Sequence, residues 1–152
     1  MNNFRYRPKD NYIYEANWEQ LYILTEHWKS NLLFYNVDLK FLHHLIDKYF
    51  LFISKKENID NVQDIEISLL KLDNICDSLL ESIDLHLHHI AELIDDPFLS
   101  DSPKFRKEHE QLEDNIAQFV KDFRKNRKDV FKISEHLIKS EELVSQLNVL
   151  SK

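Results

Sequence analysis

The chain of 152 residues contains no glycine, has a hydrophobic fraction of 43% and carries a formal net charge of −7. Glycine makes up about 7% of an average protein, and it builds the tight loops that bring the backbone against phosphate groups. Dinucleotide-binding folds with a glycine fingerprint and P-loop proteins are therefore excluded. The negative net charge argues against nucleic acid as the partner.

Cysteine content and hydropathy indicate a cytoplasmic protein. The single cysteine, Cys76, has no intramolecular partner, as is typical of a reducing compartment. The sequence has neither a basic-then-apolar leader at Met1 nor an apolar run near the ~18 residues of a membrane span. We therefore expect no membrane insertion.

Residues 1–15 are predicted to form an extended N-terminal arm, because they are polar, carry three tyrosines and contain Pro8. A helical pattern then starts near Ala16 or Asn17 and continues to about Lys55. Its apolar and aromatic residues recur at steps of three and four, which is typical of a helix with one buried face. They include Trp18, Leu21, Trp28, Leu32, Tyr35, Leu39, Leu42, Ile46 and Tyr49.

A second helix is predicted from about Asp60 to Asp95–Pro97, where proline lacks an amide hydrogen and restricts the residue before it. Ser102 and Pro103 then form an N-cap followed by proline at the first helical position. The third helix starts there and is expected to continue to the C-terminus, with a break near Asn126–Asp129 as the alternative.

Residues 16–152 are thus predicted to form one all-α domain. Short connections make successive helices antiparallel neighbours, so we expect an elongated antiparallel bundle of three long helices. A break in the last helix would give four.

Folding the chain about its two expected turns brings histidines of all three helices to one level of the bundle. His27 lies opposite His86, and His86 lies opposite His109. The last two fall on apolar stripes and are predicted to face inward. His89 follows His86 by three residues and Glu113 follows His109 by four, so each pair shares a helix face.

These side chains form a candidate metal site. Imidazole is a good ligand for zinc, iron and copper, a carboxylate reduces the charge of the bound cation, and bundle cores often hold such ligands on facing helices. We therefore predict a metal-binding bundle in which His86, His89, His109 and Glu113 hold zinc or iron, with His27 as an outer ligand. The alternative is a structural layer of histidines that bond to carboxylates or water. No substrate or reaction follows from the sequence.

Comparison with known bundle metalloproteins defines no family. The chain lacks the Glu-x-x-His pairs of ferritin-like di-iron proteins. His109 with Glu113, and His88 with Glu92, have the His-x-x-x-Glu spacing of hemerythrin-like proteins, but no His-x-x-x-His is present.

A second hypothesis is a non-catalytic interaction or scaffold protein that self-associates or binds a partner helix. The run Tyr49–Ile53 is apolar on nearly every side of its helix, and such a helix needs burial all round. We therefore predict a homodimer surface at Tyr49, Phe50 and Phe52. The basic run from Lys121 to Lys128 is interpreted as a solvated helix face.

Overall fold

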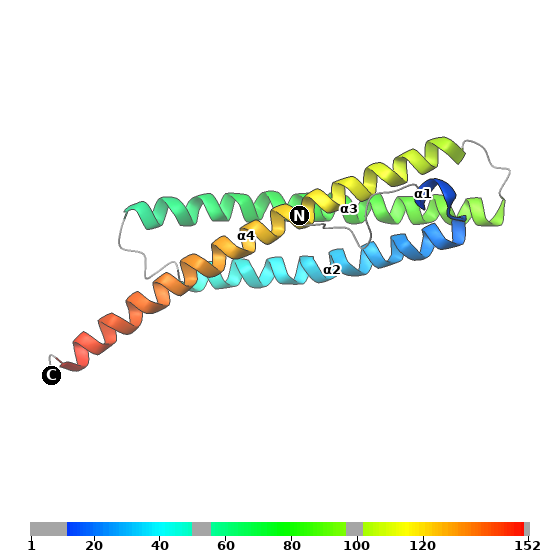
Figure 1. The fold of residues 1–152 in the computed structure, drawn as a ribbon. Coiled ribbons are helices and arrows are strands. Elements are labelled where there is room, and N and C mark those ends of the chain that lie inside the picture. The colour runs from blue at the N-terminus through cyan, green and yellow to red at the C-terminus, as the bar shows by residue number, and fades with distance from the viewer. Residues whose placement is uncertain (1–11, 50–55, 97–101, 151–152) are drawn as a thin grey trace. The chain divides into compact units, whose positions relative to one another are not determined.

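The computed structural model describes residues 12–49, 56–96 and 102–150, and the side chains of residues 13–48, 59–96 and 103–136. This part of the chain is helical and contains no strand. Its helices, shown in chain order in Figure 1, are α1 (Tyr12–Glu15), α2 (Trp18–Tyr49), α3 (Lys56–Asp95) and α4 (Ser102–Leu150). The prediction of an all-α bundle with three long helices is confirmed.

The start of α2 is fixed by a reciprocal pair of hydrogen bonds. The backbone amide of Gln20 donates to Oδ1 of Asn17 at 2.8 Å, and the amide of Asn17 donates to Oε1 of Gln20 at 2.9 Å. This capping box satisfies two amides that the first helical turn leaves without partners. The predicted start near Asn17 follows from this local chemistry.

Two expectations about the helical segments are corrected and one is confirmed. Helix α3 begins at Lys56 rather than near Asp60, because a start read from the spacing of apolar residues does not register a polar first turn. Residues Tyr12–Glu15, expected to be extended, form the helical turn α1, while residues 1–11 lie outside the described part. Helix α4 is continuous through Asn126–Asp129.

The short helix α1 is held against the start of α4. Nη1 of Arg106 donates to the backbone oxygens of Ile13 at 2.6 Å and Ala16 at 2.7 Å, and its guanidinium lies 4.3 Å from the ring centre of Trp18. Ile13 and Ala16 are buried. The arginine donates to the carbonyls of two buried residues, which stabilises this segment against α4.

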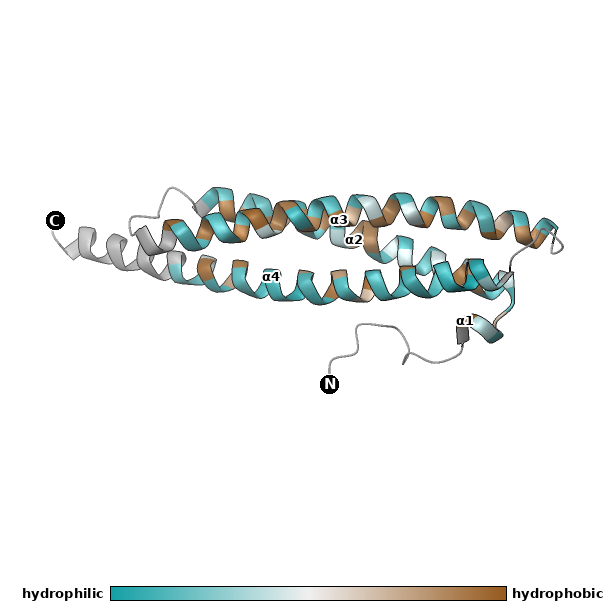
Figure 2. Cartoon of the chain, turned by 90° about the horizontal axis from the view of Figure 1, so that it is seen from above, coloured by the Kyte–Doolittle hydropathy of each residue, from teal (hydrophilic) through white to brown (hydrophobic). Residues whose placement is uncertain are grey.

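The chain divides into two compact units, each built from parts of α2, α3 and α4. Unit 1 comprises Met1–Asn36 with Asn74–Lys121, and unit 2 comprises Val37–Asp73 with Asp122–Lys152. Hydrophobic and hydrophilic residues alternate along the three long helices, as expected of helices with one buried face (Figure 2). No helix among the described residues is long and apolar enough to cross a membrane.

In unit 1, α2 and α4 run parallel and α3 runs antiparallel to both. Along α2, Trp28 contacts His109 and Tyr35 contacts Phe119, so the residue numbers of the two helices rise together. The thiol of Cys76 donates to the backbone oxygen of α2 residue Leu32 at 3.5 Å. The core of unit 1 contains Leu21, Leu32, Cys76, Leu79, Ile83, Ile90, Leu112, Ile116 and Phe119.

In unit 2, polar pairs flank the apolar core. Nε2 of His43 lies 2.5 Å from Oδ2 of Asp73, joining α2 to α3. Nε of Arg127 donates to Oδ2 of Asp38 at 3.2 Å, joining α4 to α2. The core of unit 2 contains Leu39, Leu42, Ile46, Val62, Leu69, Leu72, Phe123 and Val130.

Candidate functional site

His86 of α3 and His109 of α4 face each other inside unit 1. Nε2 of His86 lies 2.7 Å from Nδ1 of His109, and the ring centroids are 4.8 Å apart. The two residues are 6% and 0% exposed. A neutral imidazole has one donor and one acceptor nitrogen, so one ring donates its proton to the lone pair of the other. The inward orientation predicted for both histidines is confirmed.

Helix phase explains why both rings point inward. His86 lies on the same stripe of α3 as Ile83 and Ile90, which are fully buried, and His109 lies on the same stripe of α4 as Leu112. Residues three and four apart occupy one face of a helix, so the apolar stripes carry the imidazoles into the core with them.

Trp28 of α2 packs on the ring of His109. Its ring centroid lies 4.6 Å from that of His109, with an interplanar angle of 30°. Trp28 is buried. The helical pattern predicts this tryptophan on the apolar stripe, but nothing in that pattern distinguishes it from other core positions.

Burial makes the neutral form of His86 the stable one. Desolvation, with a smaller electrostatic contribution from His89, lowers the pKa of His86 from its usual value near 6.5 to about 4. A buried imidazole loses the hydration that stabilises its charged form, which is why its pKa falls. His86 is therefore uncharged at neutral pH and has a lone pair available.

The other predicted ligands differ in their surroundings. Glu113 is buried one helical turn after His109, while His89 is half-buried with its ring edge against Phe105 at a centroid distance of 5.5 Å. His27 is exposed on α2, since its neighbour Trp28 occupies the inward position. His27, predicted as an outer ligand, therefore lies away from the buried face of α2 that contacts the pair.

Among the described side chains, no group of three or more His, Cys, Asp and Glu residues is arranged to hold a metal ion. The structure brings together two of the five predicted ligands, His86 and His109, as a direct pair. What it shows chemically is a buried hydrogen bond between two imidazoles on different helices.

A second feature, in unit 2, is a surface where α2 and α4 expose apolar side chains side by side. Val37 is 66% exposed, Phe41 48% and Phe131 36%. The rings of Phe41 and Phe131 are 6.4 Å apart, and the guanidinium of Arg127 lies 4.6 Å from the ring centre of Phe131. We call Val37, Phe41, Arg127 and Phe131 the α2–α4 aromatic surface.

Two predictions concern this region, a solvated basic run and a dimer surface. The basic side chains of the run from Lys121 to Lys128 are exposed, as expected of a solvated helix face, and within it Arg127 contacts Asp38 and the ring of Phe131. The predicted dimer surface at Tyr49, Phe50 and Phe52 lies outside the described side chains.

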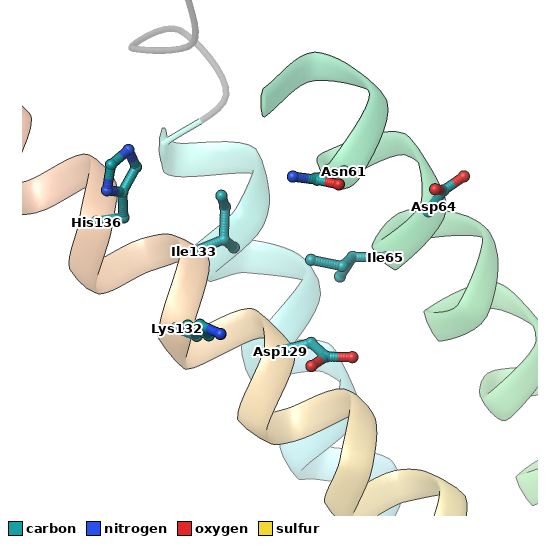
Figure 3. A pocket seen from close by; sticks show the side chains of 7 residues that line it. All are labelled: Asn61, Asp64, Ile65, Asp129, Lys132, Ile133 and His136. Atoms are coloured by element: carbon teal, nitrogen blue, oxygen red, sulfur yellow. The ribbon is translucent and has the colours of Figure 1, made fainter. Parts of the chain in front are cut away.

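Unit 2 also contains an open pocket of about 550 Å³ between α3 and α4. In Figure 3, Ile65 extends from α3 toward α4, whereas Asp64 points away from it. The lining mixes acidic, basic and apolar side chains, so it favours no single class of ligand; its residues are Asn61, Asp64, Ile65, Asp129, Lys132, Ile133 and His136.

Comparison with known proteins places the chain in no family. No protein-family profile matches it, and neither a curated protein nor a solved structure shows significant similarity to it.

Proposed function

We propose that this chain is a non-catalytic helical interaction protein, and that the α2–α4 aromatic surface of unit 2 binds a helix of another protein or of a second copy. The observation that carries the proposal is the exposure of Val37, Phe41 and Phe131 on two adjacent helices. Isolated exposed apolar residues are common, but a cluster that includes two contacting aromatic rings marks an interaction site.

The composition of the surface supports this function. Aromatic residues and arginine are enriched at protein interfaces and dominate the residues whose truncation costs most affinity. Arg127 is already held in place by Asp38 and by the ring of Phe131. Because its side chain is ordered before binding, little conformational entropy is lost when a partner docks.

The proposal is tested with Phe41→Ser and Phe131→Ser. Both rings are partly exposed, so these changes affect binding more than folding. Removal of a central aromatic anchor costs about 2 kcal/mol, which is a roughly 30-fold loss of affinity. Leu85→Ser is the matched control, since Leu85 is 59% exposed on α3 of unit 1.

Sedimentation velocity over a wide concentration range measures self-association of the wild type and the three variants. If the wild type is monomeric, a photoreactive residue placed at position 41 traps the partner in cells, with position 85 as the control. The proposal predicts a species, homomeric or crosslinked, that depends on Phe41 and not on Leu85. A monomer with no crosslink specific to position 41 contradicts it.

A further inference from the structure

We infer that the partner at the α2–α4 aromatic surface is α3 of a second copy of this chain, which docks there head to tail. The inference rests on the function proposed above and names the occupant of the same surface. In unit 2, α3 exposes Ile67 by 53% and Leu70 by 57%, and Asp60 and Asp64 are exposed beside them. Residues three and four apart share one side of a helix, so we call these four residues the α3 outer face.

The α3 outer face and the α2–α4 aromatic surface lie on opposite sides of unit 2. Hydrogen bonds join α2 to α4 and α2 to α3, and the open pocket lies between α3 and α4. Three helices that contact one another form a triangle in cross-section. Ile67 is two residues before the fully buried Leu69, a rotation of about 200°, so it points away from α2 and α4, as Asp64 does in Figure 3. A contact between the two surfaces must therefore be intermolecular.

The two surfaces carry opposite charges. Residues 122–132 of α4 contain five lysines and arginines against two aspartates. Exposed Lys128 lies three residues before Phe131, on the same side of the helix. Residues 59–73 of α3 contain four aspartates and glutamates against one lysine. Carboxylates beside the apolar residues of one surface thus complement cations beside the aromatic rings of the other, and such complementarity selects the partner and the register.

A symmetric dimer through the α2–α4 aromatic surface lacks this complementarity. A two-fold interface brings the same surface of both copies together. The basic residues of α4 would then face their own counterparts, and like charges across an interface cost free energy. Docking of α3 places the carboxylates of Asp60 and Asp64 there instead, while Ile67 and Leu70 cover the rings of Phe41 and Phe131.

A head-to-tail contact has a consequence that a symmetric one lacks. Each chain in a dimer still has one surface of each kind uncovered, so association continues beyond the dimer into rings or open chains. Two variants that each lose a different surface can therefore form only one junction with each other.

The experiment uses the full-length chain and two such variants. Phe41→Ser disables the α2–α4 aromatic surface and Ile67→Ser disables the α3 outer face. Both side chains are about half exposed, so we expect both variants to keep the helical circular dichroism spectrum of the wild type. Leu85→Ser, on α3 of unit 1, is the matched control.

Sedimentation velocity over a concentration series is expected to show dimers and larger species for the wild type and the control. Phe41→Ser alone is expected to associate about 30-fold more weakly, and Ile67→Ser alone about 10-fold more weakly. Their equimolar mixture is expected to form a 1:1 dimer that grows no further. An ionic strength of about 0.5 M is expected to weaken every one of these associations, because it screens the complementary charges.

Three results overturn the inference. Dimers that Phe41→Ser abolishes and Ile67→Ser leaves intact indicate a symmetric pair and leave the proposed function standing. A wild type that stays monomeric at millimolar concentration excludes the second copy, and the crosslink at position 41 then decides separately whether the proposed function survives. If a variant fails to fold, a photoreactive residue at position 41 is expected to join the peptide of a second copy that contains Ile67; joining to α2 or α4 of that copy contradicts the inference.

Discussion

Acidification tests the burial of His86 through the stability of the protein. The folded state holds the pKa of His86 at about 4, while the unfolded chain has the usual value near 6.5. Between these two values the unfolded state binds a proton that the folded state does not. The free energy of unfolding therefore falls as the pH falls through this window, and it is fully retained above about pH 6.5.

The size of the effect follows from the shift. A pKa difference of about 2.5 units corresponds to about 3 kcal/mol when the pH has fallen to the folded-state value. About 2 kcal/mol of this is lost between about pH 7.5 and about pH 5, before most carboxylates titrate. The titratable groups that interact with the ring are His109 of α4 and His89 of α3.

Urea denaturation of chelator-treated protein at a series of pH values measures the effect. We expect the wild type to lose about 2 kcal/mol more than a His86→Gln variant over that range, with a slope that approaches one proton. His88→Gln is the control, because it removes an exposed histidine from the same helix and leaves the buried pair in place. Parallel curves for the wild type and His86→Gln would refute the argument from burial.

Three further predictions concern the packing of the helices in unit 1. Arg106→Met removes two hydrogen bonds to the segment before α2, so we expect a loss of about 2 kcal/mol and faster amide exchange in α1, with Lys107→Met near neutral. Leu32→Ala is expected to destabilise by about 3 kcal/mol and Leu33→Ala by about 0.5 kcal/mol in chemical denaturation, because Leu32 is fully buried and Leu33 is 47% exposed. The buried thiol of Cys76 is expected to react with a thiol reagent only when the fold opens, so the rate of modification rises with urea concentration. Modification as fast as that of free cysteine would show that α2 and α3 do not pack as described.

Most of the fold follows from signals that act over one or two turns of chain. The start of α2 comes from the side chains of Asn17 and Gln20, and α4 begins at Ser102, where the sequence Ser102-Pro103 predicts a helix start. The inward phase of His86 is fixed by its apolar neighbours three and four residues away. Because short connections force successive long helices side by side, the meeting of His86 with His109 also follows from the sequence.

The features that the sequence does not predict, the helical turn α1 and the outward position of His27, depend on contacts between residues far apart in the chain. The helical turn α1 needs Arg106 of α4 to satisfy its carbonyls, and no local pattern predicts that partner. His27 was expected near the pair, but one residue corresponds to 100° of rotation, which is enough to put Trp28 inside and His27 outside.

The aromatic surface was missed for a different reason. Helix α2 carries apolar residues both on its buried stripe and at the exposed positions Val37 and Phe41. Periodicity shows which residues can share a face, but it does not show which of two apolar faces is covered by neighbouring helices. Only the placement of α4, with Phe131 beside Phe41, identifies the uncovered one.

The direct hydrogen bond between two imidazoles of α3 and α4 is most sharply tested by nuclear magnetic resonance on ¹⁵N-labelled, metal-free protein. Scalar coupling across an N–H···N hydrogen bond connects the two ring nitrogens only when they share a proton. We predict such a coupling between Nε2 of His86 and Nδ1 of His109, with slow exchange of that proton with water. Absence of the coupling, together with ring protons that exchange as fast as those of the exposed His88, would contradict the account.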